Sequence, residues 1–173
     1  AQHRACHGFA FQIPSSWQWA RLGEVGTFIS GYTPNATSLC SSGEIPYFKV
    51  SDMNTRGNER FLRVTANYLR TSSRTFPRNT IVYPKNGGAV FTNKRRLLIQ
   101  DSVVDLNTGG FLPSSKLSVA YLFYFFCTID FNKCSKGSAL PTIDAHKLFN
   151  MLIPLPPLAE QERIVAKLED CLA

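Results

Sequence analysis

Between positions 45 and 112 the chain alternates short runs of β-branched and aromatic residues with residues that favour turns. Such runs, bounded by glycine, proline or asparagine, are typical of β-strands. Their spacing predicts a twisted, mainly antiparallel sheet or a partial barrel. The strands are predicted at 45–50, 80–83, 89–92, 97–99 and 103–106, with glycine-pair turns at 87–88 and 109–110.

The pattern changes after Ser118, where an almost continuous apolar stretch occupies 121–126. It predicts a buried helix with Ser118 as its N-cap, and a strand is the alternative interpretation of so short a run. A second short helix is predicted at 142–149. Residues 151–154 are expected to be extended, because the prolines in and after this segment oppose a helix.

After Pro157 the apolar positions follow a helical period. Seven-residue spacing predicts an apolar stripe that needs a second helix to cover it, as at the start of a coiled coil. The alternative interpretation is a helix that folds back on its own domain. The residues expected to meet a partner helix are Leu158, Gln161, Ile164, Val165, Leu168 and Leu172.

Together these patterns predict the fold class α+β: a twisted, mainly antiparallel sheet or partial barrel with short helices, followed by the start of a long C-terminal helix of the coiled-coil type. The predicted organisation is a disordered lead-in at 1–12, one domain at 13–156 and the start of the long helix at 157–173. A length of 173 residues fits this plan of one domain with an appended element.

Positive charge is concentrated in one segment of the chain. The net charge is +7, but positions 49–96 hold eleven basic and two acidic residues, a local balance of +9, and the rest of the chain balances to −2. A localised basic stretch on a near-neutral domain is expected where a phosphate backbone binds. The alternative is a solvated face that only keeps the protein soluble.

The sequence offers no catalytic set. It lacks the Asn-Pro-Pro or Asp-Pro-Pro loop of DNA methyltransferases and any Gly-x-Gly nucleotide loop. Asp101 and Asp105 could share one face of a strand, but no third metal ligand is evident, so a structural role is favoured. We therefore expect no catalytic residue and no enzyme activity.

Metal binding, disulfides and membrane insertion are not expected either. The five cysteines are odd in number and form no Cys-x-x-Cys, and His3 with Cys6 is too small a ligand set. The longest apolar run, 119–127, has nine residues, whereas a membrane span needs about 20. No secretory signal is recognisable, which predicts a cytoplasmic protein.

Near its end the chain reads IPLPPLAEQERIV at 153–165. This run closely resembles the start of the conserved region of type I restriction-modification specificity subunits, where a proline-rich strand leads into a long helix. Segments 17–23, GYTP at 31–34, IPYFKVSD at 45–52 and 141–148 resemble further parts of that family in the same order. The resemblance covers about 13–170.

The resemblance implies a bacterial or archaeal, non-catalytic module that reads double-stranded DNA. It implies methyltransferase subunits as partners, with the restriction subunit joining through the complex. S-adenosylmethionine, ATP and magnesium would be bound by those partners and not by this chain. Specificity subunits normally hold two recognition domains, so this single copy implies a fragment, or a half-subunit that pairs with a second half or as a homodimer.

Two other classes of function stay open at this point. One is the target-recognition fragment of a fused restriction-methyltransferase enzyme. The other is an RNA-binding module, which would be expected to expose stacking aromatic residues.

We expect basic residues at 49–96 to contact phosphates, and polar residues on the same loops to read base edges. A third basic stretch, rich in small residues, follows at 133–138. The candidate DNA-binding residues are Lys49, Asn54, Arg56, Asn58, Arg60, Lys85, Asn93, Lys94, Arg95, Arg96, Lys133, Lys136 and Ser138.

Overall fold

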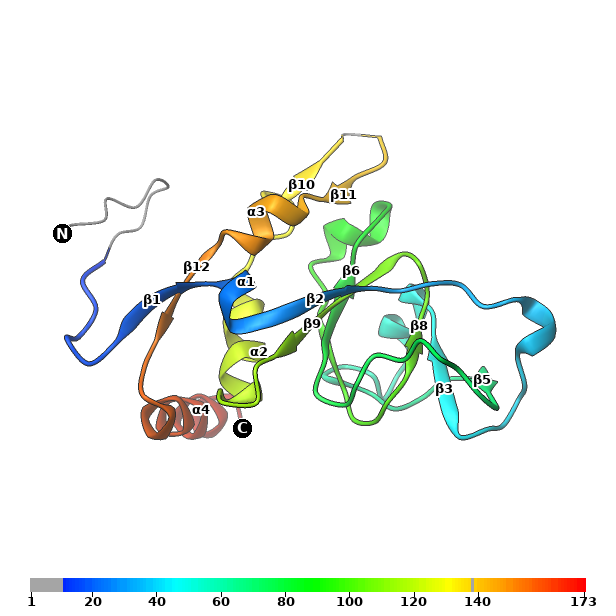
Figure 1. The fold of residues 1–173 in the computed structure, drawn as a ribbon, viewed down its shortest axis with the longest axis horizontal. Helices are drawn as coiled ribbons and strands as arrows, with labels where there is room; N and C mark the ends of the chain where they lie inside the picture. Colours follow the sequence, from blue (N-terminus) through cyan, green and yellow to red (C-terminus); the bar gives the residue numbers. More distant parts are fainter. Residues whose placement is uncertain (1–10, 138) are drawn as a thin grey trace.

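The computed structural model describes residues 11–137 and 139–173, and its chain path is drawn in Figure 1. The expected lead-in at 1–12 therefore falls almost wholly outside the described residues. The predicted class is confirmed: the domain is α+β, with open, mostly antiparallel sheets and few helices.

The largest sheet has five strands in the order β2-β9-β6-β7-β4. Its pairings are antiparallel except that of β4 with β7, which is parallel. Both edges of this sheet are open, so it does not close into a barrel. Its strands are β2 (Gly26–Ser30), β4 (Phe61–Leu62), β6 (Ile81–Pro84), β7 (Arg96–Leu98) and β9 (Thr108–Pro113).

Three further strands form a smaller sheet in the order β5-β3-β8. The pairing of β3 with β8 is parallel, with Tyr47 opposite Val103, and the pairing of β3 with β5 is antiparallel. This sheet lies at the opposite end of the molecule from α4 in Figure 1. Its strands are β3 (Ile45–Phe48), β5 (Tyr68–Leu69) and β8 (Val103–Val104), and short 3-10 helices lie at η1 (Ala36–Ser38) and η2 (Val50–Asn54).

Two-stranded ribbons join parts of the chain that are distant in sequence or project from the body. β1 (Gln18–Arg21) pairs antiparallel with β12 (Leu152–Leu155), which places the start of the described chain beside its last strand. β10 (Ser135–Lys136) and β11 (Thr142–Ile143) form a hairpin. The remaining helices are α1 (Leu22–Val25), α2 (Val119–Thr128), α3 (Ala145–Phe149) and α4 (Leu158–Leu172).

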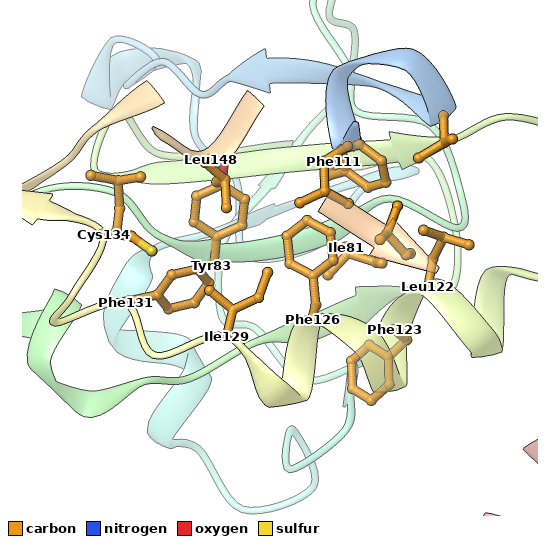
Figure 2. Close-up of a cluster of buried hydrophobic side chains, with 14 of the residues drawn as sticks. Ile81, Tyr83, Phe111, Leu122, Phe123, Phe126, Ile129, Phe131, Cys134 and Leu148 are labelled. Carbon is orange, nitrogen blue, oxygen red and sulfur yellow. The ribbon is translucent and has the colours of Figure 1, made fainter. Parts of the chain in front are cut away.

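The main core lies between α2 and the five-stranded sheet. Phe126 of α2 points towards Phe111 of β9, with ring centroids 5.0 Å apart, and Tyr83 of β6 lies 5.2 Å from Phe131 (Figure 2). Each fully buried phenylalanine contributes roughly 1.5–3 kcal/mol. This burial holds α2 in place, so the helical interpretation of 121–126 is confirmed.

Local hydrogen bonds account for the start of α2. Ser118 accepts a hydrogen bond at its Oγ from the Tyr121 amide, at 3.3 Å, which satisfies one of the free amides of the first turn. The predicted N-cap is therefore correct.

The helix predicted at 142–149 is shorter than expected. Thr142 and Ile143 pair with β10, and Asp144 accepts hydrogen bonds from the His146 and Lys147 amides. Asp144 is therefore the N-cap, and α3 begins only at Ala145.

The strand predicted at 89–92 is wrong. This segment is a 3-10 helix, η3 (Gly88–Thr92), preceded by Gly87 with φ +75° and followed by Asn93 with φ +51°. The positive φ angles at both ends turn the backbone away from the extended conformation, so the segment cannot continue β6 as a strand.

The turn predicted at Gly109-Gly110 is also wrong, because both glycines lie inside β9. A Cβ atom at Gly110 would stand 2.4 Å from the ring of Phe76, and one at Gly109 would stand 2.8 Å from the ring of Tyr83. The two glycines admit neighbouring aromatic rings against the strand and do not reverse the chain.

Candidate nucleic-acid interface

Loops from distant parts of the sequence meet at one end of the strands. We call this surface the loop edge and define it as residues 49–60, 85–96, 105–107, 129–137 and 139–143. Hydrogen bonds join its segments, so they form one connected surface. The bonds run from Val50 N to Asp105 Oδ2 (3.0 Å), from Arg96 Nη2 to Met53 O (2.7 Å), from Lys85 N to Asn107 O (2.6 Å) and from Gly87 N to Pro141 O (2.8 Å).

Strand direction explains why these loops meet. Lys49 follows β3, and Lys85 follows β6. The β8–β9 turn lies beside both strand ends, because Asp105 donates its amide to Phe48 O at 3.0 Å and Pro84 pairs with Thr108. The topology therefore brings the predicted residues of the first two basic stretches to one end of the sheets.

Several of the predicted residues expose their side chains on the loop edge. Lys49, Asn54, Arg56, Lys133 and Lys136 are exposed. The structure therefore leaves cations and amides accessible on several neighbouring loops.

Two further lysines are less exposed. Lys85 and Lys94 are partly buried, and the ammonium of Lys94 donates to Asn54 Oδ1. Ser138 lies outside the described residues.

Asn58 is a correction to the expected surface, because its side chain is fully buried. Its Nδ2 donates to the carbonyl oxygens of Asp52 (2.9 Å) and Val64 (2.8 Å). Its Oδ1 accepts from the amides of Arg63 (2.8 Å) and Val64 (2.9 Å). Every hydrogen-bonding position of this amide is used inside the domain, so Asn58 holds the loop closed and has none left for a base.

Arg95 and Arg96 also serve the fold. Arg95 donates to Ile129 O at 2.6 Å, and its guanidinium lies 4.6 Å from the ring centre of Phe131. Arg96 donates to Met53 O at 2.7 Å and to Arg95 O at 2.8 Å. Burial lowers the pKa of both guanidiniums, which nevertheless stay charged. These side chains join β7 to its neighbours, and they are not the freely presented readers that we expected.

Asn93 has a similar inward role. Its left-handed backbone ends η3, and its Oδ1 accepts the Phe131 amide at 2.7 Å. Its Nδ2 donates to Asp130 Oδ1 at 3.2 Å. Asn93 therefore connects η3 to the segment after α2.

Arg60 connects the loop edge to α4. Its guanidinium donates to Glu169 Oε1 at 2.7 Å and lies 5.1–5.7 Å from the ring centres of Phe61, Phe123 and Tyr124. The Tyr124 hydroxyl donates to the same carboxylate oxygen at 3.2 Å. This hydrogen bonding, from Arg60 above all, lowers the pKa of Glu169.

The six residues predicted to meet a partner helix divide into two groups. Gln161 is buried, accepting the Ser118 amide at 3.0 Å and donating to Pro156 O at 2.9 Å. Ile164 and Val165 pack against the main core. The first turns of α4 therefore fold back on their own domain, which corrects the expectation for these three residues. The other three, Leu158, Leu168 and Leu172, are exposed.

The basic segment 49–96 does not form a single surface. Arg63 follows β4 and Arg78 precedes β6, which places both at the far end of the sheet from Lys85. Arg70 follows Leu69, which pairs with the first residue of β3, so it too lies away from Lys49. Because the chain reverses direction between these strands, the basic residues at 49–96 are divided between the two ends of the sheets.

Three apolar side chains on the loop edge were not anticipated. Phe91 of η3, Leu106 of the β8–β9 turn and Leu140 of the β10–β11 hairpin are 51%, 48% and 78% exposed. The sequence pattern had placed Phe91 and Leu106 in predicted strands, and it made no prediction for Leu140. In the sequence, only turn-forming residues close to such positions, such as Gly137 before Leu140, could have indicated exposure.

The acidic residues give no sign of a metal centre. Asp105 accepts from the Thr108 hydroxyl at 2.7 Å, and Asp101 accepts from the Arg78 amide at 2.8 Å, so each stabilises a turn. Within residues 11–137 and 139–173, no three His, Cys, Asp or Glu side chains are close enough to hold an ion. No helix of that described part is both long and apolar enough to cross a membrane.

These features define an α+β domain with exposed cations gathered on connected loops, as in nucleic-acid-binding modules. Residues 14–173 match the model of the type I restriction modification DNA specificity domain. The chain belongs to this family.

Two curated relatives extend the comparison. The chain is 26% identical over 162 residues to the type I restriction enzyme EcoR124I/EcoR124II specificity subunit of Escherichia coli, covering 88% of this chain and 40% of that protein. It is 25% identical over 170 residues to the MjaVIII specificity subunit of Methanocaldococcus jannaschii, covering 95% and 37%. The chain thus spans about 40% of the length of the relatives it matches.

Solved structures share the fold. The HsdS subunit from Thermoanaerobacter tengcongensis superposes with a TM-score of 0.73 at 22% identity, over 93% of this chain and 38% of that one. A chain from the work "Structural basis underlying complex assembly and conformational transition of the type I R-M system" gives 0.79 at 21% identity, over 94% and 40%. The domain therefore has the architecture of part of a specificity subunit.

Proposed function

We propose that this domain reads the sequence of double-stranded DNA with its loop edge and catalyses no reaction itself. The observation that carries the proposal is the gathering of exposed lysines, amides and apolar side chains on connected loops of a DNA specificity domain. Such loops provide both the cations that bind phosphates and the groups that distinguish base edges.

The exposed side chains suggest a division of roles. Lys49 follows β3 and the partly exposed Lys85 follows β6, and both are placed to contact phosphates, releasing counterions. Asn54 is the last residue of η2 and Arg56 follows it in the next loop; both are exposed and are matched to adenine and guanine edges respectively. Arg95 and Arg96 stabilise these loops through their hydrogen bonds to Ile129 O and Met53 O.

We propose that the longer protein of which such a domain forms part directs methyltransferase and restriction subunits to a DNA target. A second specificity half, or a second copy of this chain, would read the other part of the site. The exposed residues Leu158, Leu168 and Leu172 of α4 are suited to contact a partner helix. S-adenosylmethionine, ATP and magnesium would be bound by the partner subunits.

The test is duplex binding across a salt series. We expect the logarithm of the association constant to fall linearly with the logarithm of salt concentration, with a slope of about −0.9 per phosphate contact. Lys49→Ala combined with Lys85→Ala should make this slope shallower by up to about 1.8, because two contacts are lost. Fluorescence anisotropy with a labelled duplex measures both quantities.

The matched control is Arg70→Ala combined with Arg78→Ala, which removes the same charge from the other end of the strands. This variant should keep the wild-type slope. A salt-independent affinity for the wild type, or equal slope changes in the two double variants, would refute the assignment of DNA binding to the loop edge.

A further inference from the structure

The β10–β11 hairpin projects from the loop edge (Figure 1). Cys134 O accepts the Asp144 amide at 2.7 Å, and Lys136 forms an ion pair with Asp144 at 3.0 Å, which closes its base. The loop after β6 supports one side, because Ile143 donates its amide to Lys85 O at 2.9 Å. The hairpin is therefore fixed to the domain on two sides.

Leu140 stands on the hairpin loop with 78% of its surface exposed. The residue after it is anchored, because Pro141 O accepts the Gly87 amide at 2.8 Å. Leu140 shares the loop edge with two further exposed apolar side chains, Phe91 and Leu106. Several exposed apolar side chains on one surface, unlike a single one, indicate that a partner buries them.

The surroundings of the hairpin indicate an anionic partner. Lys133, Lys136 and Lys147 lie on or beside it and are all exposed. Two carboxylates lie nearby: Asp144 pairs with Lys136, and Asp130 accepts the Asn132 amide at 3.1 Å. The three lysines therefore exceed the carboxylates by one charge, and Lys133 and Lys147 have no carboxylate partner among the described residues. A protein partner that buried Leu140 would also have to meet these ammonium groups, whereas a nucleic-acid groove places phosphates beside an apolar base surface.

We propose that the β10–β11 hairpin enters the major groove and that Leu140 contacts the 5-methyl group of a thymine. The inference rests on the proposed DNA-reading function and names one of its contacts. A two-stranded ribbon fits the width of the major groove, and the thymine methyl is the apolar group exposed there. The flanking lysines then face the phosphates on the groove walls.

The experiment replaces thymine by deoxyuridine, which removes only the methyl group. Binding duplexes are first selected from a randomised pool with the 173-residue chain, and each thymine is then replaced in turn. For the wild type, one replacement should weaken binding about fourfold, the value for one apolar carbon group returned to water. Leu140→Ala should bind the thymine and uracil duplexes equally.

The control is Leu152→Ala, which removes an exposed leucine from β12 and should keep the fourfold difference. Circular dichroism checks that both variants are folded. A selected site in which every thymine tolerates uracil, or a Leu140→Ala protein that still distinguishes the two bases, overturns the inference while leaving duplex binding intact. A chain that selects no duplex overturns the proposed function as well.

Discussion

The segment 93–96 and the β10–β11 hairpin both belong to the loop edge and both are rich in cations, yet they direct their side chains oppositely. Arg95 and Arg96 donate to carbonyl oxygens of neighbouring segments. On the hairpin, Lys136 keeps 70% of its side chain exposed even while paired with Asp144. A basic residue next to a buried strand is used to join elements, and a basic residue on a projecting turn remains free to meet a ligand.

Asn58 gives the strongest test of the inward-facing group. Asn58→Ala removes the hydrogen bonds of a fully buried side chain to four backbone groups of the surrounding loop, and of these groups Asp52 O keeps the Thr55 amide as a partner. We expect a loss of about 3 kcal/mol in the free energy of unfolding, because each unsatisfied group costs roughly 1–3 kcal/mol and water restores some of them. Urea unfolding followed by circular dichroism measures it.

Asn54→Ala is the control for that change, since it removes the same amide from the exposed side of the same loop. It should alter the free energy of unfolding by less than about 0.5 kcal/mol and act on DNA affinity instead. Equal destabilisation by the two variants would remove the distinction between inward and outward side chains.

Arg96→Ala is expected to have the next largest effect. It removes hydrogen bonds to Met53 O and Arg95 O and should cost about 2 kcal/mol of stability, as for bonds donated by charged groups. Arg56→Ala, from the exposed loop, should leave the urea midpoint nearly unchanged. If Arg96→Ala instead keeps full stability while its DNA affinity falls, Arg96 belongs with the DNA-contacting residues.

Sequence patterns were sufficient where a local signal decides the structure. Ser118 before an apolar run predicted α2, and the proline run before Leu158 predicted β12 and the start of α4. Sequence patterns failed where residues distant in the sequence decide the structure. The Gly109-Gly110 pair suggested a turn, but Gly110 lies within β9 and leaves room for the ring of Phe76.

The same limit applies to the candidate DNA-binding residues. Basic and amide residues were correctly expected on loops, but the direction of each side chain depends on long-range partners. The Asn58 side chain is enclosed by the backbone at residues 63–64, and Arg95 reaches Ile129, which lies 34 positions away. Neither contact produces a periodic pattern of apolar and polar residues from which it could have been predicted. Gln161 likewise looked like part of the helix stripe, although its side-chain oxygen accepts the Ser118 amide inside the domain.

Arg60 lies between the two groups, since its cation joins the loop edge to α4 at a partly exposed ion pair with Glu169. Arg60 lowers the pKa of Glu169, so the pair stabilises the fold above the carboxyl's unfolded pKa and this stabilisation is lost as the pH falls through the folded value. Glu169→Gln should therefore be slightly less stable than the wild type at pH 7, and the difference should narrow as the pH falls to about 3. Urea midpoints measured at both pH values test this convergence, with Glu162→Gln, an exposed residue on the same helix, as the control. A stability difference that persists unchanged at the acidic pH would mean that packing against Tyr124, and not the charge on Glu169, holds α4 to the loop edge.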